Sequence, residues 1–234
     1  MPLIELKALI IILLPIIVVG YFYHKWAKDS FEVLWATIRM IVQLLLIGFV
    51  LNYIFNTTSG LLGLLIVMFM IIVSSWIVMR STHTKSWSHY FTIVTIIFIV
   101  GTALLLIVLY AVIQLHPLYQ PKYIIPIAGM IYANIMIVLS LFIERIESEL
   151  QSIDFIQARS IAFKAAMIPQ INTFLAVGMV SLPGMMTGQI LSGVDPLIAV
   201  RYQIVVMAMI FSSAGISVIL YSFYKASNVK GDTK

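Results

Sequence analysis

Long hydrophobic stretches separated by short polar segments run through the whole chain. There are seven such stretches, and each is near the ~20 residues that a helix needs to cross about 30 Å of hydrocarbon. The pattern predicts an all-α, polytopic membrane protein with about seven transmembrane helices in a single transmembrane domain, residues 1–234. The stretches cover approximately residues 3–23, 38–55, 61–79, 91–113, 123–143, 167–193 and 202–224.

Composition supports the same class. The 234 residues are 62% hydrophobic and only 10% charged, whereas a soluble domain carries about 25% charged residues. The chain has no cysteine, which excludes disulfide bonds and thiolate metal sites.

Lysine and arginine are distributed unevenly between the two sets of loops. If the N-terminus is outside, only Lys7, Lys122 and Arg201 of the fourteen basic residues lie on the outer side. Because basic residues gather in cytoplasmic loops, this bias predicts an outside N-terminus and a cytoplasmic C-terminus. It also accounts for the net charge of +5 without any nucleic-acid partner.

The longest cytoplasmic segment predicted from this pattern is residues 144–166. It alternates four acidic and three basic residues with apolar ones, as in an amphipathic helix. Two interpretations fit the pattern: a helix lying on lipid headgroups, or a surface that docks another protein.

Catalytic groups are missing from the predicted spans. The four histidines fall in loops without zinc-binding spacing, and the chain has no GxxxxGK[ST] phosphate loop. The spans also lack the buried carboxylates typical of ion-coupled transport. We therefore expect no enzyme activity, and any energy for transport to come from another polypeptide. A passive channel would need no such energy source.

Polar side chains within the spans are the remaining candidates for a substrate pathway. Arg39 and Gln43 are four residues apart and share a helix face. Asn134 and Asn172 stand alone in later spans. Each could instead form an interhelical hydrogen bond, worth about 0.6 kcal/mol.

The stretch SLPGMMTGQILSG, residues 181–193, interrupts the sixth apolar region. Pro183 cannot donate a backbone hydrogen bond and should free the carbonyl near Met179. In lipid, such a break survives only beside protein or a water-lined cavity. The spacing of Gly184, Gly188 and Ser192 predicts close approach of a neighbouring helix.

Four further side chains surround this break and are candidates for the pathway: Met185, Met186, Thr187 and Gln189. Sulfur and amide oxygen are possible ligands for a soft or borderline metal ion. Methionine more often fills space in an apolar core, so the metal site stays unknown at this point.

Two segments resemble those of a known family. AAMIPQINTFLAVGMVSLPGMMTGQILSGVDPLIAVRYQIVVM, residues 165–207, is similar to the signature of the FetB-type permeases, and IRMIVQLLLIGFVL, residues 38–51, resembles that family's second helix. These permeases are membrane subunits of small ABC transporters associated with bacterial iron export, with plant relatives linked to aluminium tolerance.

The resemblance implies a permease subunit in a bacterial plasma membrane. Two copies would pair with two separate ATP-binding subunits and export iron or another metal ion. ATP-Mg would bind to the partner chain, and this chain would hold no cofactor. The alternative is an ATP-independent channel or a membrane scaffold protein.

The resemblance also gives the cytoplasmic segment a role in docking the ATPase. Asp154 stands where the family usually has glycine, before Gln157 and Ala158. The candidate contacts within residues 144–166 are Glu144, Glu147, Glu149, Asp154, Arg159 and Lys164.

Overall fold

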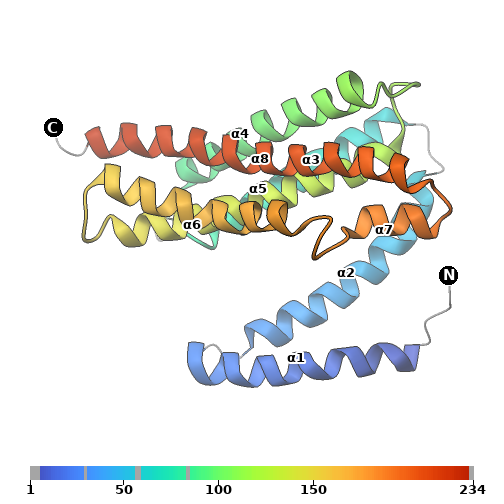
Figure 1. Ribbon diagram of the computed structural model, residues 1–234. Helices are drawn as coiled ribbons and strands as arrows, with labels where there is room; N and C mark the ends of the chain where they lie inside the picture. The colour runs from blue at the N-terminus through green and yellow to red at the C-terminus, as the bar shows by residue number, and fades with distance from the viewer. Residues whose placement is uncertain (1–5, 29–30, 56–58, 83–84, 232–234) are drawn as a thin grey trace. The chain divides into compact units, whose positions relative to one another are not determined.

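The computed structural model describes residues 6–28, 31–55, 59–82 and 85–231. These residues form helices and no β-strand (Figure 1). The elements are α1 Leu6–Ala27, α2 Glu32–Phe55, α3 Gly60–Met79, α4 Trp87–Leu106, the π-helix η1 Ile107–Val112, α5 Pro121–Glu149, α6 Phe155–Ala176, α7 Gly184–Leu191 and α8 Pro196–Gly231.

The chain divides into two compact units, Met1–Thr57 and Thr58–Lys234. In the first unit, α1 and α2 pack as a helical pair, where Gly20 lies against Val33. Both Arg39 and Gln43 are exposed on α2.

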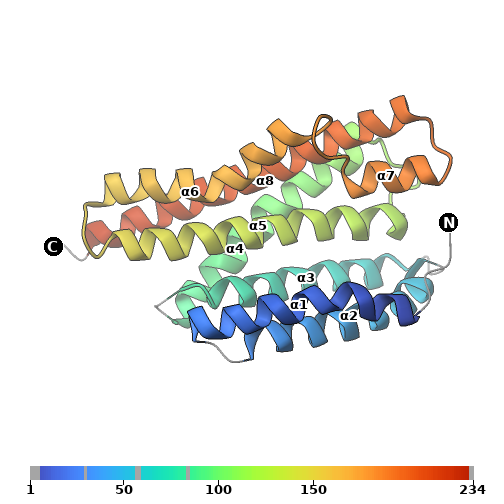
Figure 2. The ribbon, with the colours of Figure 1, turned by 60° about the horizontal axis from the view of Figure 1, so that its bottom comes forward.

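The second unit is built around α5, which contacts α3, α4, α6 and α8 (Figure 2). Its buried positions recur every three or four residues, as expected for one helix face. Ile131, Ile135, Leu139 and Phe142 are fully buried on that face. At Gly101 of α4, the ring of Tyr132 lies where a Cβ would be.

In the second unit, α3, α4, α5, α6 and α8 alternate in direction, and α7 continues in the direction of α6 (Figure 1). The α3–α4 loop, the α5–α6 turn and the C-terminal part of α8 therefore meet at one end, which we call the hairpin end. These are the loops predicted to be cytoplasmic. The side of the membrane that they face stays a prediction.

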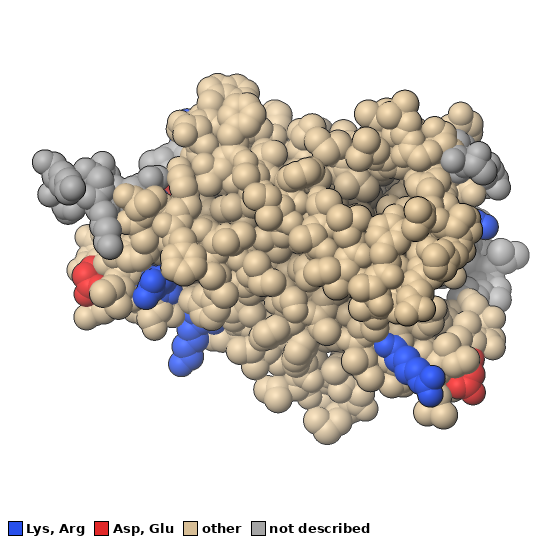
Figure 3. Space-filling view, turned by 90° about the horizontal axis from the view of Figure 1, so that it is seen from above, with Lys and Arg blue, Asp and Glu red and all other residues tan. Residues whose placement is uncertain are grey.

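Among the residues that the structure describes, five helices are long and apolar enough to cross a membrane: α2, α3, α4 with η1, α5 and α8. The apolar part of α1, Ile11–Ala27, is shorter. The all-α membrane fold is confirmed, but the count of seven spans stays a prediction. On the face in Figure 3, charged side chains lie at the two ends and uncharged ones fill the band between them, as expected for a membrane protein.

Two sequence boundaries are corrected by the structure. The sixth apolar region is interrupted as predicted, but the break comes earlier: α6 runs from Phe155 to Ala176, and the eight-residue α7 begins at Gly184. The segment 144–166 is not one amphipathic helix either. It comprises the end of α5, a turn, and the first turns of α6.

Asp154 explains where the new helix starts. It has an extended backbone and its carboxylate accepts hydrogen bonds from the Ile156 and Gln157 amides at 2.8 and 3.1 Å. This is an N-cap, which satisfies amide groups that a helix start leaves without partners.

Candidate functional site

The break between α6 and α7 closes its own backbone hydrogen bonds. The Ala176 carbonyl accepts from the amides of Val180 and Ser181 at 2.8 and 3.1 Å, and the Gly178 amide donates to the Ser181 carbonyl at 3.0 Å. Gly178 has φ +82°, a left-handed conformation that favours glycine. The helix therefore ends well before Pro183.

Pro183 lies at the break, as predicted, but after the end of α6. It lies outside a helix, as the N-cap of α7, so it does not free a carbonyl within a continuous span. Its own carbonyl accepts from the Thr187 amide at 3.0 Å and from the Thr187 hydroxyl at 3.1 Å.

The structure shows no close neighbour at Gly184 or Gly188 within the second unit, so close packing of a helix there stays a prediction. A Cβ added at either glycine would meet no atom within 4 Å, because α7 lies at the edge of the second unit and contacts α8. Ser192 is exposed, and its hydroxyl donates to the Gly188 carbonyl at 2.8 Å.

The four side chains predicted around the break lie on α7 and are all half-buried. Met186 lines a cavity that also includes Pro183. The Gln189 side-chain oxygen is buried and has no hydrogen-bond partner among the described residues. Met185 packs against the hydrophobic core.

Asn134 joins three helices near the middle of the second unit. Its Nδ2 donates to the Ile210 carbonyl of α8 at 2.8 Å and lies 3.4 Å from the Ser213 hydroxyl. Its Oδ1 accepts from Gln170 Nε2 of α6 at 2.9 Å. Asn172 is exposed on α6 and takes no part in these hydrogen bonds. The structure thus gives Asn134 the interhelical bonding role; a pathway role stays a prediction.

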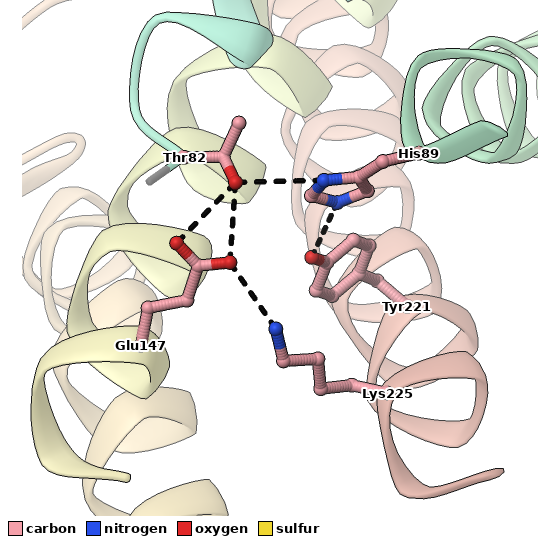
Figure 4. Close-up of polar contacts among 5 residues, drawn as sticks. All are labelled: Thr82, His89, Glu147, Tyr221 and Lys225. Carbon is pink, nitrogen blue, oxygen red and sulfur yellow. Dashed lines mark hydrogen bonds and ion pairs between the residues drawn. The ribbon is translucent and has the colours of Figure 1, made fainter. Parts of the chain in front are cut away.

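A second polar cluster lies at the hairpin end (Figure 4). Glu147 of α5 accepts hydrogen bonds from Thr82 Oγ1 at 3.1 and 3.3 Å and forms an ion pair with Lys225 of α8 at 3.2 Å. His89 Nδ1 lies 3.4 Å from Thr82 Oγ1, and His89 Nε2 lies 2.7 Å from the Tyr221 hydroxyl. The cluster joins the α3–α4 loop to α4, α5 and α8.

The Thr82 hydroxyl is both a donor and an acceptor in this cluster. The single hydroxyl proton of Thr82 is donated to the Glu147 carboxylate, so the Thr82 oxygen can only accept from His89 Nδ1. His89 thereby connects Thr82 to the Tyr221 hydroxyl.

Glu147 is therefore not an exposed docking contact, as was predicted, because it is buried in this cluster. Among the other docking candidates, Glu149 pairs with Arg145 at 2.6 Å, and the Arg159 guanidinium lies over the Phe155 ring at 5.7 Å. Glu144 and Lys164 are exposed.

Sequence reasoning missed Gln170 and four members of the Glu147 cluster: Thr82, His89, Tyr221 and Lys225. Gln170 carried a local signal, as an amide within an apolar region. The other four residues had no local sequence signal, because their hydrogen-bond partners lie up to 132 residues away in the sequence.

The structure does not gather the predicted pathway residues into a metal site. No group of three or more His, Asp or Glu side chains suited to a metal ion occurs in the described ranges. Asn134 lies in the second unit, and Arg39 and Gln43 lie in the first.

Comparison with known proteins gives one family. A model described as "Uncharacterised protein family (UPF0014)" matches residues 5–155 and 153–229. The chain is 33% identical to the "Probable iron export permease protein FetB" of Escherichia coli (strain K12) over 232 residues, covering 92% of this chain and 88% of that protein.

Further relatives occur in another bacterium and in plants. The "UPF0014 membrane protein YjkA" of Bacillus subtilis (strain 168) is 35% identical, with 88% of each chain covered. The "UPF0014 membrane protein STAR2" of Oryza sativa subsp. japonica is 32% identical, with 82% of this chain and 72% of that protein covered. No solved structure matches the chain.

These matches confirm the resemblance seen in residues 165–207 and 38–51. They extend it to almost the entire chain and agree with the apolar helices described above. Among these relatives, the Escherichia coli protein is named a permease. This chain belongs to the UPF0014 family of multi-pass membrane proteins.

Proposed function

We propose that this chain is the membrane-spanning subunit of an ABC transporter that exports iron or another metal ion. A separate ATP-binding subunit supplies the energy and holds ATP-Mg, and two copies of each chain form the transporter in a bacterial plasma membrane. The name of the Escherichia coli relative supports iron export. The lack of a phosphate loop in this sequence supports a separate ATPase.

The α5–α6 turn is the proposed docking surface for the ATPase. Charged side chains lie on both sides of the turn, with Glu144 exposed at the end of α5, Arg159 on the first turns of α6, and Lys164 exposed one turn further. Charges of both signs at the rim favour a specific partner over a uniformly anionic lipid surface.

The Glu147 cluster is the observation that carries this proposal. Glu147 lies three residues before the α5–α6 turn, and its carboxylate contacts Thr82 and Lys225. A displacement of the turn by a docked ATPase would therefore be passed to the α3–α4 loop and to α8. Small displacements at one site are commonly amplified through such packed interfaces in switching proteins.

The proposed cargo passes near the interrupted crossing. There the chain is non-helical between Ala176 and Gly184. Asn134 of α5 forms hydrogen bonds with the two long helices on either side of this break, α6 and α8. Non-helical backbone at membrane depth is typical of transporter sites. A pathway that offers a metal ion few ligands favours its release, because tight coordination would keep the ion bound.

Co-expression with an ATP-binding protein encoded beside this chain tests the proposal. We expect a stable complex whose ATPase activity responds to metal ions, and ATP-dependent metal movement in vesicles containing both chains. Glu144→Lys combined with Arg159→Glu should weaken the complex, while Lys122→Glu at the opposite end should leave it intact.

Three outcomes would contradict the proposal. Metal movement at the same rate without ATP would indicate a channel. Neither association nor metal movement would indicate a scaffold. Full catalytic activity of the chain alone would indicate an enzyme.

A further inference from the structure

A cavity of about 400 Å³ lies beside the interrupted crossing, entirely within the second unit. It is formed by the end of α6, the connecting loop, α7 and the first half of α8. Its lining is almost wholly apolar and includes Phe174, Leu182, Met186, Gln203, Ile204 and Met207. A mostly apolar cavity of this size with one polar group is typical of a small-molecule site.

Gln203 is the polar group in this lining. Its side chain is only 6% exposed, and its Oε1 atom is buried without a hydrogen-bond partner in the described chain. A buried acceptor of this kind costs about 1–3 kcal/mol if it stays unpaired. A ligand that donates an N–H or O–H would remove that cost.

The opening of the cavity is also apolar. Leu182 and Ile204 are 60% and 63% exposed, and α8 is long and apolar enough to span a membrane. At this depth the surrounding solvent is lipid rather than water. Lipid acyl chains are therefore the apolar groups that have direct access to the cavity.

A bare metal ion does not suit the same cavity. It would have to lose its hydration shell for one amide oxygen and two thioethers, from Gln203, Met186 and Met207. Removing a charge from water without paired ligands is very costly. The lining fits an apolar chain that ends in a hydrogen-bond donor.

The position of Gln203 agrees with that orientation. It lies seven residues after Pro196, which begins α8, at about 10 Å along the helix axis. Met207 and Ala208 line the cavity one turn deeper. A lipid whose head-group donor lies at the level of Gln203 would place its acyl chain against these deeper residues.

We propose that this cavity binds one acyl chain of a membrane glycerophospholipid whose head group donates a hydrogen bond to Gln203, as phosphatidylethanolamine can. This lipid site is separate from the proposed metal cargo. Its test therefore does not depend on ATP or on the ATPase.

The test uses the full chain in nanodiscs that contain a phosphatidylethanolamine analogue with a photoreactive acyl chain. We expect crosslinks to concentrate on residues 174–186 and 200–208. Ala208→Trp should fill the cavity and reduce them at least fivefold, with Val200→Phe as a second filling variant. Ile216→Trp, on an exposed part of α8 outside the lining, should leave them unchanged.

The head-group contact is tested by competition between phosphatidylethanolamine and phosphatidylcholine, which has no donor. Gln203→Leu should reduce the preference for phosphatidylethanolamine about three- to tenfold. Unchanged crosslinking in both filling variants, or crosslinks spread evenly over all exposed helices, would overturn the site. Unchanged lipid preference in Gln203→Leu would overturn the head-group assignment.

Discussion

Glu147 of α5, which is buried, and Lys225 of α8, which is partly buried, form an ion pair with 3.2 Å between Oε1 and Nζ. The two residues are 78 positions apart in the sequence. Thr82 also donates to the same carboxylate. This pair fixes the end of α5, and with it the α5–α6 turn, to the C-terminal part of α8.

Removing the acid should destabilise the protein strongly. Glu147→Ala leaves the Lys225 ammonium without its anionic partner. Breaking a fully buried pair from one side typically costs about 3–5 kcal/mol, and the partial exposure of Lys225 places the expected loss at or below the lower end of that range. A chemical denaturation series in mild detergent would measure the loss. Glu147→Gln together with Lys225→Met should recover much of it, because neither charge is then left unpaired.

The matched control is the exposed ion pair between Arg145 and Glu149, four residues apart on α5. Arg145→Gln should cost less than about 1 kcal/mol, because water screens exposed pairs. Equal losses for Glu147→Ala and Arg145→Gln would show that the Glu147 cluster is not a structural link.

Asn134 should contribute to stability through its three interhelical contacts. Asn134→Ala removes the bonds to Ile210, Ser213 and Gln170. At about 0.6 kcal/mol for each bond, the expected loss is on the order of 1–2 kcal/mol. Asn172→Ala is the control, since Asn172 is exposed on α6.

Transport by these two variants separates the possible roles of the amides. If Asn134→Ala is destabilised but moves metal normally once assembled, the residue holds helices together only. If Asn172→Ala loses transport at unchanged stability, that exposed amide belongs to the pathway. Equal thermal stability of Asn134→Ala and the unaltered protein would contradict the bonding role.

The break between α6 and α7 should depend on Gly178. Gly178→Ala places a Cβ on a residue with φ +82°, and a left-handed conformation costs about 1–2 kcal/mol for residues other than glycine. Thermal melting should shift down accordingly. Gly184→Ala is the control: its Cβ would meet no atom within 4 Å, and an unstrained alanine there should change melting little.

Asp154 should stabilise the start of α6 as its N-cap. Asp154→Ala should cost about 0.5–2 kcal/mol, whereas Asp154→Gly should cost only a few tenths. The glycine variant also restores the residue usual in the resembling family. Both variants should be compared by denaturation and by binding to the ATPase; equal losses for the two would argue against a capping role.

Much of the fold followed from local sequence. The apolar stretches at 61–79 and 91–113 became α3 and α4 with η1 almost as expected, because a membrane span is defined by its own length and hydrophobicity. The predicted helix boundaries were wrong where a capping residue ended or began a helix at a position that hydropathy alone did not mark. Gly178 ends α6 early, and Asp154 begins α6 inside a segment whose pattern predicts one amphipathic helix.

The candidate site was less predictable. Asn134 stood out as an amide in an apolar span, but its partners on α6 and α8 lie 36 to 79 positions away. Glu147 looked like a surface acid because its neighbours in sequence are charged. Only the packing of α5 against α8 and the α3–α4 loop shows that it is buried.

The sequence by itself determined that this chain is an all-α membrane protein of its family and that its sixth apolar region is interrupted, because hydrophobicity, glycine and helix capping act over a few residues. The tertiary structure alone decided that Glu147 pairs with Lys225 and that Gln203 faces a cavity. Burial depends on which distant helix packs against a residue, and no short stretch of sequence contains that contact.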